Sequence, residues 1–403
     1  MVSAAVSIDL RFPHECRLLT SRTIIRANSP AKDSVSNPTP ARKRVLSGMR
    51  PTGKPHLGNY MGALHNWVRL QNDPQYECYF FIADLHALTT DYADPSQIAP
   101  NTRDVALDYL AAGLDPAKSV LFVQSHVRQH YELPLLLGMI TPLGWLERVP
   151  SYKEMQENLA SKDLTNFGFL GYPVLMASDI LLYQADFVPV GQDQQAHVEL
   201  TREIARRFNQ FYPKARHGEY ENIGRVEILR LPILPEPQVL LTPSPKLPGT
   251  DGRKMSKSYG NTILLSDPEP EIRAKLKTMV TDPARIRRTD PGNPDKCPVG
   301  DLHKIFSSQE TLAKVYEGCT TAGIGCIECK SWAADAIVSA LAPIQERRVY
   351  FEQNPALVAD IFSDGARRAA ARAEQTMHEV RSAMGLDSAF DSTLSSARSG
   401  TSA

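Results

Sequence analysis

Two short segments, around residues 56 and 256, carry the side chains best suited to chemistry on a triphosphate. The first places His56 and Gly58 at a predicted turn from strand to helix, where backbone N–H groups and the helix dipole attract an anion. The second sets Lys254 and Lys257 beside two hydroxyls in a glycine-flanked loop. Positive charge placed there stabilises the negative charge that accumulates on a leaving pyrophosphate. Together the two segments predict adenylate chemistry.

A sheet and its surrounding helices must position these segments. From residue 42 onward, strand-like apolar runs alternate with helix-like stretches, which is typical of an α/β protein with a parallel, right-handed sheet. The predicted strands are 44–47, 78–83, 119–123 and 187–190. The helix that follows the first segment is expected to continue through Tyr60, Ala63, Leu64 and Trp67.

Strand signals fade after residue 267, and amphipathic helical segments follow. One such helix is expected to begin at Ser363 and end at Gly385. Its apolar face is formed by Ala366, Ala369, Ala370, Ala373, Met377, Val380 and Met384. Residues 231–253, rich in proline and glycine, predict an irregular loop that leads into the lysine segment. The expected parts are a tail (1–42), a catalytic domain with a helical insertion (43–267), a helical domain containing a cysteine cluster (268–390) and a second tail (391–403).

Composition sets the broad class. A chain of 403 residues with 42% apolar content can bury the cores of two domains. Its 45 basic and 45 acidic residues balance, so net charge gives no sign of a nucleic-acid partner. The longest apolar candidate, 172–190, carries two aspartates, which excludes a membrane span. The basic, Ser-rich first tail predicts either a disordered segment of a cytoplasmic protein or a transit peptide to an organelle matrix.

A second candidate site lies on the helix predicted after Gly171. Pro173 suits a first helical turn, so Tyr172, Met176 and Asp179 fall on one face. An indole ring needs one acceptor for its N–H and a large apolar slot, and Asp179 with Met176 can supply both. The alternative is that these residues are merely core and cap residues of a buried helix.

Four of the six cysteines fall between residues 297 and 329. Cys297, Cys319, Cys326 and Cys329 supply four thiolates, which suits a tetrahedral metal ion or a cubane iron–sulfur cluster. Disulfides are the poorer explanation in an intracellular enzyme. Unconnected buried thiols are the remaining alternative.

With its His56-Leu57-Gly58-Asn59 element and its intact 254–258 motif, the chain resembles the class I aminoacyl-tRNA synthetases, and within them the tryptophanyl branch. The resemblance covers residues 44–386 and includes segments 83–89 and 190–194. It implies a Rossmann-like, doubly wound parallel sheet, a C-terminal α-helical domain that binds the tRNA anticodon, and a homodimer. The implied reaction is ATP-dependent activation of L-tryptophan to tryptophanyl-adenylate, followed by transfer to tRNA(Trp).

The resemblance also implies roles for single residues. His56, Lys254 and Lys257 would be catalytic, together with Mg²⁺ held mainly by phosphates and water. The implied ATP contacts are Arg50, Pro51, Thr52, Gly58, Asn59, Gly191, Gln192, Asp193, Val239, Lys254, Met255, Ser256, Lys257 and Ser258. The implied tryptophan contacts are Asp179, Tyr172, Met176, Gln194 and His86, the last of which has a structural role as its alternative. The four cysteines resemble a pattern that binds a [4Fe-4S] cluster in some bacterial members, with Zn²⁺ as the lesser alternative.

Three rival functions remain at this point. A tyrosyl-specific enzyme is opposed by Met176, because tyrosyl enzymes typically carry glutamine there. A non-catalytic RNA-binding relative is opposed by the intact lysine motif. A small nucleotidyltransferase is opposed by the chain length, the helical domain and the cysteines.

Overall fold

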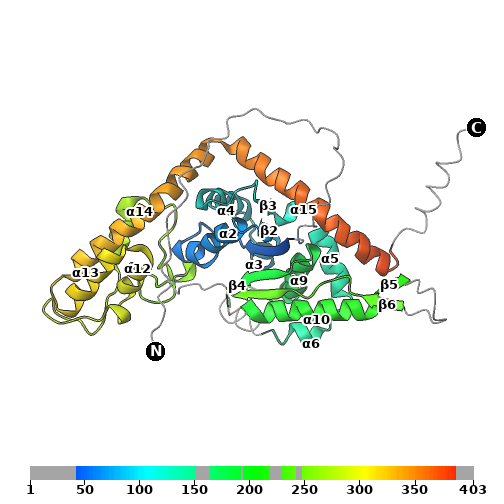
Figure 1. The fold of residues 1–403 in the computed structure, drawn as a ribbon, viewed down its shortest axis with the longest axis horizontal. Coiled ribbons are helices and arrows are strands. Elements are labelled where there is room, and N and C mark those ends of the chain that lie inside the picture. The colour runs from blue at the N-terminus through cyan, green and yellow to red at the C-terminus, as the bar shows by residue number, and fades with distance from the viewer. Residues whose placement is uncertain (1–41, 150–163, 192–193, 218–227, 242–246, 387–403) are drawn as a thin grey trace, which may run out of the picture. The chain divides into compact units, whose positions relative to one another are not determined.

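The computed structural model describes residues 42–149, 164–191, 194–217, 228–241 and 247–386 (Figure 1). By contacts between Cα atoms, the chain from Arg42 onward forms one unit. The catalytic and helical domains expected from the sequence both lie within this unit, and the boundary between them stays a prediction. In the part of the chain that the structure describes, no helix has both the length and the apolar character needed to cross a membrane.

A five-stranded parallel sheet with the order β3-β2-β1-β4-β7 forms the centre of the fold. Its strands are β1 (Lys43–Met49), β2 (Tyr76–Ile82), β3 (Ser119–Val123), β4 (Phe187–Val190) and β7 (Gln238–Leu241). The chain builds outward from β1 to β3 on one side, and then from β4 to β7 on the other. In doubly wound sheets, ligands bind where this direction reverses, at the carboxyl ends of the strands. The predicted fold class is confirmed.

Helices of the first half connect these strands. They are α1 (Leu57–Asn59), the π-helical η1 (Tyr60–Leu64), α2 (His65–Gln71), α3 (Asp84–Asp91), α4 (Ile98–Ala112), the 3-10 turn η2 (Gln124–His126), α5 (Gln129–Gly138), α6 (Leu143–Leu146), α8 (Phe167–Leu170), α9 (Tyr172–Leu182) and α10 (Gln195–Phe211). A separate antiparallel pair consists of β5 (Lys214–His217) and β6 (Ile228–Leu231). The helix predicted after the histidine turn is confirmed, with one π-helical turn inserted in it.

Every element between residues 257 and 383 is helical, as predicted. These elements are η4 (Lys257–Tyr259), α11 (Glu269–Thr278), η5 (Pro294–Lys296), α12 (Pro298–Phe306), α13 (Gln309–Thr320), α14 (Cys326–Gln353) and α15 (Pro355–Ala383). α14 packs on α4, and α15 packs along the edge strand β3 (Figure 1). The C-terminal helices therefore contact the sheet domain directly.

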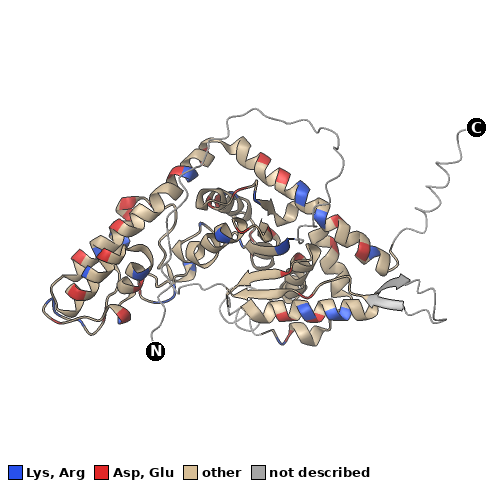
Figure 2. Ribbon diagram, viewed as in Figure 1, with Lys and Arg blue, Asp and Glu red and all other residues tan. Residues whose placement is uncertain are grey.

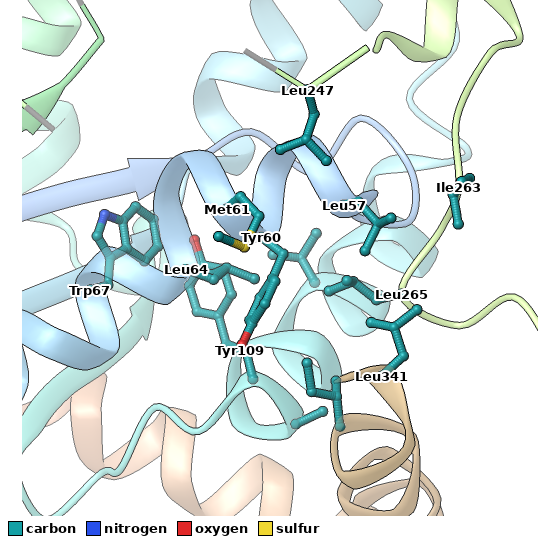
Figure 3. Packing of buried hydrophobic residues seen from close by; sticks show 14 of the residues in the cluster. Leu57, Tyr60, Met61, Leu64, Trp67, Tyr109, Leu247, Ile263, Leu265 and Leu341 are labelled. Atoms are coloured by element: carbon teal, nitrogen blue, oxygen red, sulfur yellow. The ribbon is translucent and has the colours of Figure 1, made fainter. Parts of the chain in front are cut away.

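The two faces of the sheet bury two hydrophobic clusters. Because side chains alternate along a strand, Val45 and Phe80 enter the first core cluster, while Leu46 and Phe81 enter the second. In the first, the Trp67 ring stacks on Phe80 with ring centroids 4.8 Å apart. The same cluster includes four segments distant in sequence, which carry the residues labelled in Figure 3: Leu57, Tyr60, Met61, Leu64, Trp67, Tyr109, Leu247, Ile263, Leu265 and Leu341. One core thus holds the histidine turn, the flanks of the lysine loop and α14.

Two expectations from the sequence are wrong in detail. α15 begins at Pro355, not at Ser363, and runs through Gly365, where a Cβ would lie 1.7 Å from the carbonyl oxygen of Leu121. Glycine is therefore required for close packing of the helix on β3. Ser363 looked like a helix start in the local sequence, but it lies inside α15. At the other end, Gly385 has a φ of +72°, as suits the predicted stop.

The irregular loop expected at 231–253 contains strand β7. Its four residues lie shortly after Pro235 and Pro237, and they are too few to show an alternating pattern. Pairing with β4 makes them a strand, because the ladder supplies the hydrogen bonds that local sequence does not specify. The four strands predicted from apolar runs all form.

Candidate functional site

The histidine turn is closed by a capping box. The backbone N–H of Asn59 donates to Nδ1 of His56 at 3.3 Å, and the backbone N–H of His56 donates to Oδ1 of Asn59 at 3.1 Å. A Cβ on Gly58 would lie 2.8 Å from the imidazole ring, so glycine is needed for the ring to fold over the turn. Asn59 therefore has a structural role, because its two hydrogen bonds with His56 fix the shape of the turn.

His56 is an uncharged donor in this setting. Its side chain is buried, with 8% of the residue exposed. Burial, together with Lys257 and Lys254, lowers the pKa of His56 to about 4. Because Nδ1 accepts from Asn59, the ring proton resides on Nε2. The ring can therefore donate a hydrogen bond toward a phosphate or ribose oxygen without carrying charge.

The lysine loop touches the glycine-rich turn after β1. Nζ of Lys257 donates to the carbonyl oxygen of Gly53 at 2.7 Å, and Gly53 has a φ of +107° that favours glycine. Burial lowers the pKa of Lys257 to about 8, against the opposing effect of Asp108. Lys254 and Ser258 are exposed, while Ser256 is half-buried. Between the lysines, Met255 is 4% exposed and belongs to the first core cluster.

Backbone hydrogen bonds join the two segments. The N–H of Leu57 donates to the carbonyl of Ile263 at 2.9 Å, and the N–H of Leu265 donates to the carbonyl of Pro55 at 3.1 Å. Asn261, which is 2% exposed, accepts from the backbone N–H of Ser256 at 2.8 Å. Sequence reasoning missed this asparagine. The structure thus brings the two predicted phosphate-binding segments together.

The remaining predicted ATP contacts follow β1 and β4 or lie within β7. Nη2 of Arg50 donates to Oγ1 of Thr90 at 2.6 Å, and burial lowers the pKa of Arg50 despite a nearby aspartate. After Arg50, Pro51 is buried and Thr52 is exposed; Gly191, which follows β4, is also exposed. Gln192 and Asp193 lie outside the described residues. Val239 lies inside β7, paired with Val188, and its contact with adenine stays a prediction.

Asp179 lies in a buried polar cluster. Its Oδ1 accepts from Nε2 of Gln124 at 2.7 Å and lies 2.6 Å from Nδ1 of His130. Its Oδ2 lies 2.8 Å from Nε2 of His86. Burial opposes ionisation, but hydrogen bonds from the two histidines outweigh it and lower the pKa of Asp179. The structure thus places His86 beside Asp179, while the role of His86 near a tryptophan pocket stays a prediction.

The other predicted tryptophan contacts flank this cluster. Tyr172 begins α9, and its hydroxyl lies 3.4 Å from Nε2 of His197. Met176, one turn later, is half-buried. Gln194 caps the start of α10. Arg50 interacts electrostatically with Tyr172, which connects this region with the end of β1.

Sequence reasoning missed three members of the Asp179 cluster: Gln124, His130 and Tyr183. Gln124 was detectable, because it directly follows a predicted strand and therefore lies at the same edge of the sheet as the other site residues. His130 and Tyr183 lie inside α5 and just after α9, and no local pattern distinguishes them from core residues.

The four cysteines of the C-terminal region line one cavity. Cys297 precedes α12, Cys319 lies near the end of α13, and Cys326 and Cys329 lie in the first turn of α14. All four are free thiols. Burial, and then the proximity of the other three cysteines, raise the pKa of Cys329 to about 12. The spacing therefore predicted correctly that these side chains converge.

The cavity also contains a buried cation. Arg285 is 9% exposed, and its Nη2 donates to the carbonyl oxygens of Ile324 at 2.6 Å and Arg288 at 2.9 Å. Its Nη1 lies 3.8 Å from Sγ of Cys319, and its Nε has no hydrogen-bond partner among the described residues. Within those residues, no three His, Cys, Asp or Glu side chains form a group that could hold a metal ion.

Two kinds of chemistry are therefore arranged at the carboxyl edge of the sheet. Uncharged His56 and the two lysines can bind a polyphosphate between the glycine-rich turn and the loop. The Asp179 carboxylate can accept a hydrogen bond from a second substrate. This pairing suits a reaction between a nucleoside polyphosphate and a second substrate that donates a hydrogen bond.

The chain is similar to known proteins over most of its length. A family model described as "tRNA synthetases class I (W and Y)" matches residues 39–342. A tryptophan–tRNA ligase of Thermotoga maritima is 51% identical, over 85% of this chain and 99% of that protein. One of Ralstonia nicotianae is 48% identical, over 85% of this chain and 98% of that protein. 

Among solved structures, the tryptophanyl-tRNA synthetase of Campylobacter jejuni, complexed with ADP and tryptophan, superimposes with a TM-score of 0.73. It is 32% identical, and the match covers 85% of this chain and all of that one. The family model, the relatives and the solved structure therefore all indicate the same family. The chain belongs to the class I tRNA synthetases of the tryptophan and tyrosine branch.

Proposed function

We propose that this chain is a tryptophan–tRNA ligase. A carboxylate oxygen of L-tryptophan attacks the α-phosphorus of ATP, the bond from that phosphorus to the bridging oxygen breaks, and pyrophosphate leaves with the electron pair. The terminal adenosine of tRNA(Trp) then attacks the activated carbonyl carbon and releases AMP. The relatives that bear this name are about half identical to the chain over nearly their whole length.

Asp179 carries the choice of amino acid. Its buried carboxylate is an acceptor, and the indole N–H of tryptophan is a donor that no other standard side chain presents in an aromatic ring of that size. Met176 lies one turn away on the same helix and offers apolar surface. A tyrosyl enzyme, the alternative within the branch, must satisfy a phenol that both donates and accepts.

The first step needs alignment and charge rather than a protein nucleophile. Lys257 leaves the Gly53 carbonyl and binds the pyrophosphate portion of ATP, while Lys254 approaches from the exposed side of the loop. His56 donates from Nε2 to the phosphate chain. Mg²⁺ enters with ATP, held by phosphate oxygens and water.

An exchange assay tests this proposal. With radiolabelled pyrophosphate and ATP, L-tryptophan is expected to drive exchange, and L-tyrosine at equal concentration is expected to drive almost none. Met176→Gln adds a polar group to the apolar surface and is expected to reduce the preference for tryptophan. Exchange driven equally by tyrosine in the wild-type protein would contradict the assignment.

We also propose a [4Fe-4S] cluster in the cysteine cavity. The four thiols line one cavity, and four cysteine thiolates are the usual ligands of such a cluster. Arg285, whose Nε has no hydrogen-bond partner among the described residues, would supply positive charge beside an anionic cluster. When bound, the cluster would link α12, α13 and α14 through Cys297, Cys319, Cys326 and Cys329.

Metal analysis tests the cluster. Anaerobically purified protein is expected to contain iron and absorb near the blue end of the visible spectrum, and Cys326→Ser is expected to lose both. Cys78→Ala is the matched control, because Cys78 is a buried thiol of β2 outside the cavity. Zinc in place of iron would favour the lesser alternative, and protein lacking both metals would contradict the proposal.

A homodimer is the proposed assembly, with α5 at its interface. Tyr131, Leu135 and Met139 recur at helical spacing, and they are 53%, 63% and 68% exposed. Leu143, just beyond the helix, continues the apolar surface. A second copy of the chain covers such a patch by two-fold symmetry. Leu135→Glu is expected to yield monomers in analytical ultracentrifugation, whereas Leu357→Glu, at an exposed position of α15, leaves the dimer intact.

The helical domain is the proposed anticodon-binding region. Figure 2 shows basic and acidic residues interspersed along α14 and α15, so recognition of tRNA(Trp) there rests on local groups and stacking rather than on a broad positive field. A cytoplasmic location is the corresponding proposal for the cell. Fusion of residues 1–42 to a fluorescent protein tests the alternative of an organelle address.

A further inference from the structure

The hydrogen bonds around Asp179 continue one layer deeper than its direct neighbours. Nδ1 of His130 lies 2.6 Å from Asp179, and Nε2 of the same ring lies 2.8 Å from the hydroxyl of Tyr183. His130 and Tyr183 are both 0% exposed. Neither side chain is required by the adenylation chemistry described above.

The direction of these hydrogen bonds follows from the chemistry of the groups. An ionised carboxylate only accepts, so Nδ1 of His130 must carry a proton directed at Asp179. When the ring holds one proton, the Tyr183 hydroxyl donates to Nε2 and keeps that proton on Nδ1. Tyr183 thus determines which ring nitrogen faces the carboxylate as a donor.

Packing fixes the plane of the His130 ring. The rings of Phe81, Phe122 and Tyr183 surround it, with centroids 6.0, 5.9 and 5.6 Å from the imidazole centroid. In such a setting the imidazole cannot rotate without displacing aromatic rings of the second core cluster. The donor at Nδ1 is therefore held rigidly against the carboxylate.

Among the described residues, three donors contact Asp179 and leave one position on its carboxylate unused. A carboxylate offers about four lone-pair positions. Gln124 and His130 occupy two on Oδ1, and His86 occupies one on Oδ2. The remaining position on Oδ2 suits a single N–H donor. Its direction depends on the orientation of the carboxylate plane, which the two donors on Oδ1 set.

We propose that His130, backed by the Tyr183 hydroxyl, is a positioning residue that orients Asp179 to accept the indole N–H of tryptophan. This rests on the proposed tryptophan-activating function. His86 differs, because its side chain is 12% exposed. His130 is fully buried and acts on the substrate only through Asp179.

The test compares tryptophan with 3-benzothienyl-L-alanine, in which sulfur replaces the indole N–H in a ring system of nearly the same size. ATP–pyrophosphate exchange gives kcat and KM for both amino acids. His130→Leu is expected to lower kcat/KM for tryptophan by at least about tenfold, mainly through KM, while changing the value for the analogue little. The preference for tryptophan therefore shrinks.

Three further variants make the readout specific. His130→Asn keeps an N–H donor close to the place of Nδ1 and is expected to retain most of the preference. Tyr183→Phe removes one hydroxyl at constant ring shape, with an intermediate loss expected. Asp179→Asn calibrates the assay, because the two donors on Oδ1 place the amide oxygen there and an NH2 donor replaces the acceptor Oδ2, which must reduce the preference.

Equal losses for tryptophan and the analogue in His130→Leu would overturn the proposal, since a merely structural role affects both amino acids alike. Should His130→Leu fail to fold, an unchanged preference in Tyr183→Phe, together with a lost preference in folded His130→Asn, would overturn it equally. If Asp179→Asn leaves the preference intact, the acceptor assigned under the proposed function is wrong. If the His130 and Tyr183 variants leave the preference for tryptophan intact and Asp179→Asn does not, Asp179 remains the acceptor and the positioning role of His130 fails.

Discussion

The lysine loop and the Asp179 cluster, which are the proposed contacts of the two substrates, are held in different ways. The loop is anchored by buried Met255, while Lys254 is exposed and Lys257 rests on a backbone carbonyl. Asp179 is 1% exposed and contacts three side-chain donors. Groups that must follow changing charge on a phosphate need freedom to move, whereas a group that selects a ring must keep one orientation.

The same difference governs the charges. In the phosphate-binding segments, burial lowers the pKa of both His56 and Lys257, so an anion that binds there strengthens the charged form of each group. In the Asp179 cluster, hydrogen bonds keep a buried carboxylate ionised without any substrate. The charge state of the phosphate-binding segments therefore depends on the ligand, whereas the Asp179 carboxylate is charged without one.

The largest effect is expected on stability. Asp179→Ala leaves three buried donors without their acceptor and is expected to lower the free energy of unfolding by about 3–5 kcal/mol. Lys254→Ala, at an exposed position of the loop, is expected to change it by less than about 0.5 kcal/mol. Urea denaturation measures both. Similar losses in the two variants would abolish the contrast between the regions.

For catalysis, a change in the lysine loop is expected to have a large effect. Lys257→Ala removes a charge from the leaving pyrophosphate and is expected to lower kcat of exchange by about 10²–10³-fold, with tryptophan affinity nearly unchanged. Lys314→Ala is the matched control, because that lysine of α13 is exposed and paired with Glu310 at 2.7 Å. Calorimetric titration with tryptophan separates the two effects. A parallel loss of tryptophan binding is the result that would count against this division of labour.

A pH effect on stability is expected from the histidine turn. The pKa of His56 is about 4 in the folded chain and 6.5 as a model value, so between these pH values the unfolded chain binds the extra proton. Unfolding free energy therefore rises as pH increases from about 4 to 6.5, by about 3 kcal/mol. Denaturation curves of wild type and His56→Asn over this range isolate the contribution. Parallel pH profiles would show that His56 does not cause it.

The smallest expected effect concerns ATP affinity at alkaline pH. With a pKa of about 8, Lys257 is largely uncharged at pH 9 and must take up a proton when the triphosphate binds. ATP affinity is therefore expected to fall by somewhat less than about tenfold from pH 7.5 to 9. Lys257→Arg stays charged throughout and should show a flat profile. A steep profile in this variant would place the titrating group elsewhere.

Local sequence predicted the elements that local sequence determines. The four strands predicted from apolar runs all form. α9 begins where Pro173 indicated, and it carries Tyr172, Met176 and Asp179 on its length as expected. The start of α15 and strand β7 were mispredicted, because contact with Leu121 and pairing with β4 decide them. Such contacts join residues far apart in the chain.

For the site, the sequence by itself determined the reactive side chains: the histidine turn, the lysine loop, the acceptor on α9 and the four cysteines. Their residue types and spacing limit the chemistry to a few possibilities, because charge, hydrogen-bonding capacity and helical period are local properties. Tertiary structure alone decided the states of these groups. Burial lowers the pKa of His56, the Gly53 carbonyl receives Lys257, and His130 faces Asp179. These properties depend on distance and burial, which only the folded chain defines.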